Sequence, residues 1–195
     1  MMNDVTIKHG LAPEHRGKAA ELYYTAFYQK LHPIFRDEAR GQAVIEQSLQ
    51  PEYAIVAMMN GTLVGIAGFK DSNGSLLDIQ PKTVTDVYGF FSGWLRLLAL
   101  SIFSREKQEN TLLMDGIVVD SQVRGHGIGS QLLDAMIAHA RTSGYPQVRL
   151  DVVDTNPRAR QLYERKGFVP TKSANYPYLK RIFGFSGATT MLKTV

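Results

Sequence analysis

The fold is decided by residues 117–129, which read Ile117-Val118-Val119-Asp120-Ser121-Gln122-Val123-Arg124-Gly125-His126-Gly127-Ile128-Gly129. An apolar strand here runs through a glycine-rich turn into a helix. The three glycines let the backbone turn tightly and let a ligand approach without a Cβ in the way. Amides at a helix N-terminus carry about half a positive charge and suit a phosphate, and Arg124 can add a charge-assisted contact. The stretch predicts a phosphate-binding loop, with a plain glycine-rich turn as the alternative.

The spacing excludes two other phosphate-binding loops. A dinucleotide-binding fold requires Gly-x-Gly-x-x-Gly directly after the strand. In this chain Ser130 takes the last glycine position, and residues 120–123 separate the strand from Arg124. A Walker loop requires Gly-Lys and then Ser or Thr after the glycines, and the sequence has no such run here. The loop therefore belongs to a different kind of strand–turn–helix unit.

Outward from the loop, the pattern predicts a crossover of strand, helix and strand. Residues 111–119 form the first strand and residues 148–153 the second. Residues 127–143 form an amphipathic helix with Ile128, Leu132, Met136 and Ala140 along one stripe. A crossover of this kind makes its two strands parallel, and we expect them to be adjacent.

The flanking segments predict the rest of the fold. We expect strands at 5–9, 168–169 and 188–193, and a hairpin of 53–59 with 62–69 around Asn60-Gly61. We expect helices from Pro13 to near Pro33, over 37–49, and over 157–166. The fold class is then α/β in the α+β sense: a mostly antiparallel mixed sheet with a central parallel strand pair and helices on both faces. The length suits one domain over 1–195.

Composition limits the function classes. The chain has no cysteine, which excludes a disulfide framework, a thiol nucleophile and a cysteine-based zinc site and suits a reducing cytoplasm. The N-terminus shows no signal-peptide pattern. The net charge is +4, and the basic residues concentrate in the last fifth of the chain. That excess fits an anionic cofactor, a solvated basic face or an acidic membrane. No nucleic-acid-binding motif occurs, so no nucleic-acid partner is expected.

Residues 117–129 resemble the acetyl-CoA signature of the GNAT superfamily of N-acetyltransferases, Arg/Gln-x-x-Gly-x-Gly/Ala, which Arg124, Gly127 and Gly129 fill. A second segment, residues 156–168, resembles the family's Asn-x-x-Ala-x-x-x-Tyr-x-x-x-Gly-Phe element through Asn156 and Tyr163. The two elements stand in the family's order and spacing. The resemblance is specific over 111–170, loose over 1–70 and absent over 71–110.

The resemblance implies a GNAT-like domain that uses acetyl-CoA as co-substrate, needs no metal, and transfers the acetyl group to an amine acceptor. It implies that the backbone of Ile117, Val118 and Val119 pairs with pantetheine and that Asn156 orients the cofactor near its thioester. The pyrophosphate would then be held by amides of the loop, whose residues are Arg124, Gly125, His126, Gly127, Ile128, Gly129 and Ser130.

Direct attack by an amine on a thioester requires two proton transfers. The amine, with a pKa of ~10.4, must lose a proton, and the leaving thiolate, whose conjugate thiol has a pKa of ~8.5, must gain one. By resemblance, Tyr163 protonates the thiolate; a core tyrosine is the alternative. Asp115 lies two residues before Ile117 on the same strand, which predicts side chains on one face. Asp115 is the candidate base, directly or through a water, unless it is only a satisfied strand carboxylate.

An apolar insertion departs from the family pattern at about 71–110. Within it, residues 87–103 carry only one charge, Arg96, and are shorter than the ~20 apolar residues of a membrane span. We expect residues 84–104 to form a cap whose aromatics, Tyr88, Phe90, Phe91 and Trp94, line the acceptor side. A homodimer contact and a membrane interface remain open alternatives. Two other functions also remain open, a non-catalytic acyl-CoA-binding regulatory module and a membrane-associated acyltransferase, and the acceptor is unidentified.

Overall fold

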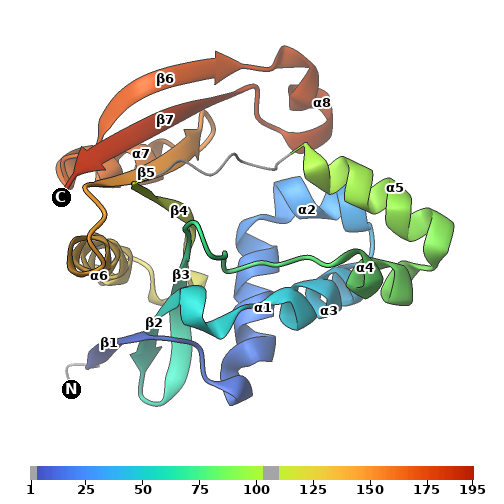
Figure 1. Cartoon of the computed structure of the whole chain (residues 1–195), viewed down its shortest axis with the longest axis horizontal. Coiled ribbons are helices and arrows are strands. Elements are labelled where there is room, and N and C mark those ends of the chain that lie inside the picture. The colour runs from blue at the N-terminus through green and yellow to red at the C-terminus, as the bar shows by residue number, and fades with distance from the viewer. Residues whose placement is uncertain (1–3, 103–109) are drawn as a thin grey trace.

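The computed structural model describes residues 4–102 and 110–195. The described strands form a seven-stranded sheet in the order β1-β2-β3-β4-β5-β7-β6 (Figure 1). All neighbours pair antiparallel except β4 and β5, which are parallel. The predicted fold class is confirmed. The strands are β1 (Val5–His9), β2 (Ala54–Met59), β3 (Thr62–Lys70), β4 (Thr111–Val119), β5 (Gln147–Val153), β6 (Val169–Asn175) and β7 (Gly187–Thr194).

Helices cover both faces of the sheet (Figure 1). The predicted stripe of α6, Ile128, Leu132, Met136 and Ala140, is buried in one core cluster. Helices α1 and α3 pack on the opposite face with a second cluster. The helices are α1 (Arg16–Ala26), α2 (Tyr28–Phe35), α3 (Glu38–Ser48), α4 (Pro81–Tyr88), α5 (Phe90–Ser101), α6 (Ile128–Thr142), α7 (Pro157–Arg165) and α8 (Lys180–Phe183).

The parallel pair β4–β5 positions the site, because its two strands pair only at their beginnings. Thr111, Leu112 and Leu113 of β4 pair with 147–149 of β5. Beyond that point β4 stays paired with β3 on its other side, but no described strand pairs with its β5-facing edge. The second half of β4 therefore borders a gap between the two strands, with no described strand paired to its β5-facing edge.

Two local expectations are refined by the structure. The β2–β3 hairpin turns at Asn60 and Gly61, both with positive φ (51° and 77°), as the dipeptide predicted. The single helical stretch expected from Pro13 to near Pro33 is wrong in detail. It is divided at Phe27, where φ is −102° and ψ is 20°, into α1 and α2, and Pro33 lies inside α2.

The expected insertion contains α4 and α5, and residues 103–109 of it lie outside the described residues. The prediction that its aromatics are buried against the acceptor side is wrong for three of them: Phe90, Phe91 and Trp94 are 66%, 84% and 51% exposed. Tyr88 instead stacks on Phe35, with ring centroids 5.9 Å apart. No described helix is both long and apolar enough to cross a bilayer.

The inner side of α5 meets residues in and around α8. Phe183 and Phe185 form a small cluster with Ile34 of α2, and Ala99 and Leu100 of α5 pack against it. Segments far apart in the chain, α2, α5 and α8, thereby come together beside the open end of the β4–β5 pair (Figure 1).

Candidate active site

A cavity of about 380 Å³ lies where β4 and β5 diverge. Its lining brings together four residues predicted from the sequence: Asp115 and Ile117 from β4, and Asn156 and Tyr163 from the α7 segment. The volume falls within the range of small-molecule sites, roughly 300–1,000 Å³. The loop 124–130 lies outside this lining, although Gly129 lies close to Val119 and to Leu162 of α7.

The predicted phosphate loop has several features that favour anion binding. Gly127 precedes α6 with φ 76°, in the left-handed region that glycine favours, and a Cβ there would meet nothing within 4 Å. Among the described residues, no side chain caps the first amides of α6. Arg124 is exposed, and its Nε donates to the Val119 carbonyl at 3.3 Å. The loop therefore offers uncapped amides, open space and a cation together.

The open edge of β4 fits the acyl-CoA arm that the resemblance implies. Ile117, Val118 and Val119 pair with β3 on one side, but no described strand pairs with their other side. The Val118 side chain is buried in the α1-side core, so this strand segment is held rigidly. An extended amide-containing chain could add to this edge as a strand would. The pantetheine contact itself stays a prediction.

The α7 segment places the predicted acid and its neighbour. Tyr163 is 5% exposed and lies beside Phe168 in the α6-side core, while also lining the cavity. Asn156 is the N-cap of α7, and its Oδ1 accepts from the Ala159 amide at 3.1 Å. Because Oδ1 is engaged in this capping bond, the side-chain NH₂ of Asn156 is the group that can donate a hydrogen bond to a ligand. Tyr163 thus packs as a core residue and also lines the cavity, while its role as the acid stays a prediction.

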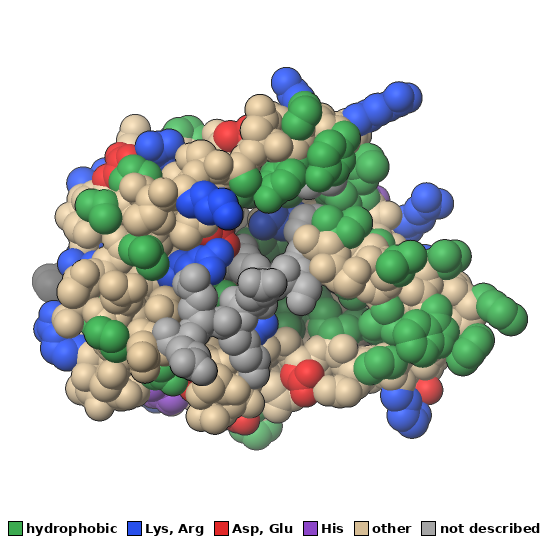
Figure 2. Space-filling model, turned by 45° about the horizontal axis from the view of Figure 1, so that its top comes forward, with side chains coloured by type: hydrophobic (Ala, Val, Ile, Leu, Met, Phe, Trp, Pro, Cys, Tyr) green, Lys and Arg blue, Asp and Glu red, His purple; other side chains and the backbone are tan. Residues whose placement is uncertain are grey.

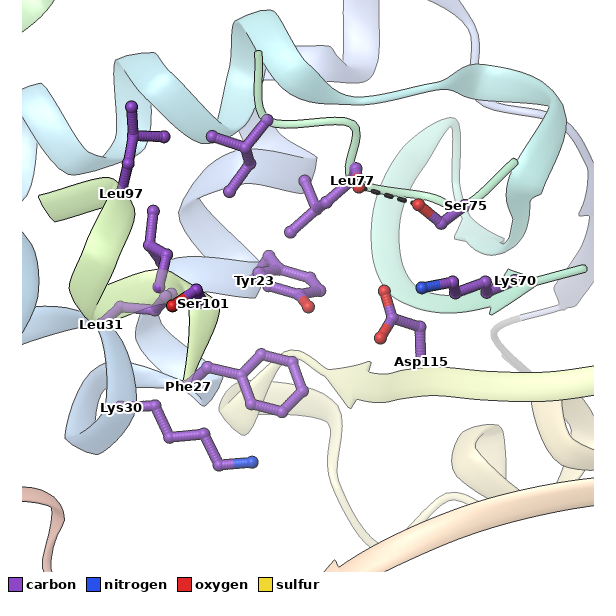
Figure 3. Close-up of a pocket in the computed structure, with 12 residues that line it drawn as sticks. Tyr23, Phe27, Lys30, Leu31, Lys70, Ser75, Leu77, Leu97, Ser101 and Asp115 are labelled. Carbon is purple, nitrogen blue, oxygen red and sulfur yellow. Dashed lines mark hydrogen bonds between the residues drawn. The ribbon is translucent and has the colours of Figure 1, made fainter. Parts of the chain in front are cut away.

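The expected orientation of Asp115 is wrong, and a β-bulge explains the difference. Gly116 pairs with Gly68 and Met114 with Phe69, so Asp115 is an extra residue on β4. The bulge interrupts the alternation: Ile117 packs towards α6, whereas Asp115 projects towards α1 (Figure 3). The carboxylate therefore faces a second cavity instead of sharing a face with Ile117.

This second cavity, of about 360 Å³, lies between α1, α2, α5 and the sheet (Figure 3). Its wall is mainly apolar, and two lysines and Asp115 are the ionisable groups besides a tyrosine. The lining consists of Tyr23, Phe27, Lys30, Leu31, Lys70, Ser75, Leu77, Ile79, Leu97, Leu100, Ser101 and Asp115. The two cavities share Phe27, Lys30 and Asp115, so they meet at the bulge.

Sequence reasoning missed Phe27, which borders both cavities. A Cβ built on Gly116 would lie 2.6 Å from the Phe27 ring. Lys30 follows it, with Nζ 5.8 Å from the Phe27 ring centroid and 5.5 Å from that of Phe185. The sequence signal that could have revealed this contact was Gly116, because a glycine inside a strand often marks the close approach of another group.

The comparisons with known proteins identify the family of this chain. The family model described as "Acetyltransferase (GNAT) family" matches residues 18–168. A Bos taurus thialysine N-epsilon-acetyltransferase is 40% identical over 65 residues, which cover 33% of this chain and 38% of that protein. The chain thus matches well under half of that relative's length.

Solved structures share the fold at low sequence identity. The Brucella melitensis ribosomal-protein-alanine N-acetyltransferase is 18% identical with a TM-score of 0.64, over 97% of this chain and 99% of that one. The Salmonella typhimurium protein yncA, solved with acetyl-CoA as its cofactor, is 18% identical with a TM-score of 0.61, over 98% of this chain and 94% of that one. With the family model covering most of its length, the chain belongs to the GNAT acetyltransferase family.

Proposed function

We propose that this protein transfers the acetyl group of acetyl-CoA to a primary amine by direct attack on the thioester. The observation that carries the proposal is the meeting of two cavities at the β4 bulge. One cavity adjoins the open β4 edge and contains Tyr163; the other opens on the opposite side of Asp115. A cofactor arm and an acceptor could thus approach one point from different directions.

In the proposed reaction, the amine nitrogen attacks the thioester carbonyl carbon, and the carbon–sulfur bond breaks. Tyr163 gives its phenolic proton to the departing sulfur. Asp115 receives the proton that the amine loses, directly or through a water. The products are an N-acetylated amine and free CoA thiol, and the two side chains regain their starting protonation by exchange with solvent. Burial of Tyr163 keeps its hydroxyl in one position, which general acid catalysis requires.

We assign the acceptor to the 360 Å³ cavity, called the acceptor cavity from here on, and its lining favours an amine attached to an apolar body. Phe27, Leu31, Leu77, Leu97 and Leu100 supply most of its wall. Burying the carbon surface of an acceptor against this wall would stabilise the complex by roughly 25 cal/mol per Å² of apolar surface. The related protein named for thialysine acetylation also acts on an amine, which supports the reaction type while the acceptor of this chain stays open.

Replacing Tyr163 by Phe tests the proposal. The variant should bind acetyl-CoA like the parent but turn over 10²–10⁴-fold more slowly, a typical loss for a general acid. Turnover is followed by thiol release with an amine panel, and affinity by calorimetry. Tyr145→Phe is the matched control, because its hydroxyl bonds Asp71 at 3.3 Å and lines neither cavity.

Turnover of the Tyr163→Phe variant within twofold of the parent would make the phenol structural. If the parent binds acetyl-CoA but releases no thiol with any amine, the chain is a non-catalytic acyl-CoA-binding module instead.

A further inference from the structure

Helix α5 is apolar over most of its surface, apart from a side that carries Ser92 and Arg96. Of its twelve residues, Phe90–Ser101, Arg96 alone is charged. A helix that is hydrophobic all round is normally buried, yet Gly93 is its buried residue. A helix of this length also depends on tertiary packing for most of its stability. The inner face of α5 packs against its own chain, whereas its outer face is exposed.

The inner face of α5 is held by its own chain. A Cβ on Gly93 would lie 2.9 Å from the backbone of α4, so the two helices cross closely. The Arg96 guanidinium lies 4.0 Å from the Tyr88 ring centroid and donates to the Ser92 carbonyl at 3.0 Å. Leu97 and Leu100 pack against the core and line the acceptor cavity. The one charge of α5 is thus turned inward and already engaged.

The outer face carries a regular apolar seam, which we call the α5 seam: Phe91, Leu95, Leu98 and Ile102. Its members are 84%, 69%, 70% and 57% exposed. Figure 2 shows hydrophobic side chains gathered over this end of the molecule. The seam residues are spaced by four, three and four positions, which is the heptad spacing of helices that pack side by side. Phe90 and Trp94, also exposed, flank the seam.

We propose that the α5 seam pairs with the same seam of a second copy of this chain, antiparallel about a two-fold axis. The axis would pass between Arg96 and Leu97. Phe91 would then lie opposite Ile102 of the partner subunit, and Leu95 opposite the partner's Leu98. The seam contains no charge, so two copies need no charge complementarity. A two-fold contact requires such a self-complementary patch.

The area agrees with a dimer. The seam and its two flanking aromatics expose on the order of 100–180 Å² each, or roughly 700–800 Å² together, close to the ~800 Å² per partner of a stable interface. A patch of this size exceeds what monomers usually leave in water. Because Leu97 and Leu100 on the inner face line the acceptor cavity, the partner would also brace one wall of that cavity.

A membrane surface fits less well. Helices that lie in a membrane interface carry lysines and arginines along their polar face. On α5 that cationic face is missing, since Arg96 is its one cation and points towards Tyr88. A four-three-four seam also matches a facing helix more closely than a fluid lipid surface.

Light scattering after gel filtration, at micromolar concentration, tests the proposal. The parent should have twice the chain mass, and Leu98→Glu should have the chain mass with unchanged circular dichroism. Ile182→Glu is the matched control: Ile182 is 58% exposed but outside the seam, so this variant should remain a dimer. A monomeric parent overturns the proposal, and sedimentation of that monomer with vesicles of phosphatidylserine and phosphatidylcholine would assign the seam to membrane. A dimeric Leu98→Glu variant overturns it as well.

Disulfide trapping tests the antiparallel register, since the chain has no native cysteine. Positions 91 and 102 lie ~16 Å apart along one helix, too far for an intrachain bond. The double variant Phe91→Cys/Ile102→Cys should therefore form a covalent dimer on mild oxidation, whereas Phe91→Cys alone should not. Cross-linking of the single Phe91→Cys variant, or no cross-linking of the double variant, would overturn the antiparallel arrangement.

Discussion

Replacing Gly127 by Val should weaken acetyl-CoA binding about 10- to 150-fold. Gly127 has φ 76° at the start of α6, a conformation that costs an L-residue roughly 1–2 kcal/mol. The loop should relieve that strain by turning its amides away from the phosphate position. Losing one hydrogen bond to a charged group costs about 1.5–3 kcal/mol, which gives the stated range in Kd.

The Gly144→Val variant is the control that separates the loss of acetyl-CoA binding from the effect of backbone strain. Gly144 has nearly the same φ, 78°, and equally open space, but it follows the far end of α6. Both variants should lose similar stability in urea, about 1–2 kcal/mol. Calorimetry with acetyl-CoA should show one site in the parent, one site with parental affinity in Gly144→Val, and weak binding in Gly127→Val. Parental affinity in Gly127→Val would refute the loop as the phosphate site.

Two further outcomes follow from particular contacts. Gly116→Ala should displace the Phe27 ring, because its Cβ would lie 2.6 Å away; we expect a loss of about 1–3 kcal/mol and a higher acceptor KM, both relieved by adding Phe27→Leu. Burial, and then the neighbouring His9, lowers the pKa of His139 below its ordinary 6.5. The unfolded chain therefore binds more protons below that pH, and stability should fall as pH drops through 6.5. His139→Gln should reduce this loss in urea titrations at pH 5.5 and 7.5, whereas an unchanged pH dependence would contradict the assignment.

Much of the fold followed from local patterns. The stripe from Ile128 to Ala140 has the period of a helix with one buried face, and the structure buries it against the sheet. Asn60-Gly61 supplies two residues that adopt positive φ, so the hairpin formed where expected. The strand–helix–strand crossover determined the parallel pair. Each of these features depends on residues close together in the chain, whose preferences a sequence displays directly.

The packing of the insertion could not be predicted from local sequence patterns. Its sequence shows that 87–103 is apolar, and α5 lies there, but α5 is apolar around most of its circumference, so its period alone does not tell which side faces inward. The close crossing at Gly93 and the Arg96–Tyr88 contact decide that Leu97 and Leu100 face the core and Trp94 faces out. Both contacts are made between α4 and α5, so the sequence of α5 alone does not reveal them.

The sequence by itself determined the fold class, the glycine loop and the family, because each rests on residue types at fixed spacing along one segment. The tertiary structure alone decided how the site is assembled. The bulge that turns Asp115 towards α1 depends on the register between β3 and β4, and the gap beside Ile117 depends on where β4 and β5 stop pairing. Phe27 enters the site because α1 crosses the sheet at Gly116. The β3–β4 register, the divergence of β4 from β5 and the crossing of α1 each depend on segments far apart in the chain. No local sequence period therefore encodes them.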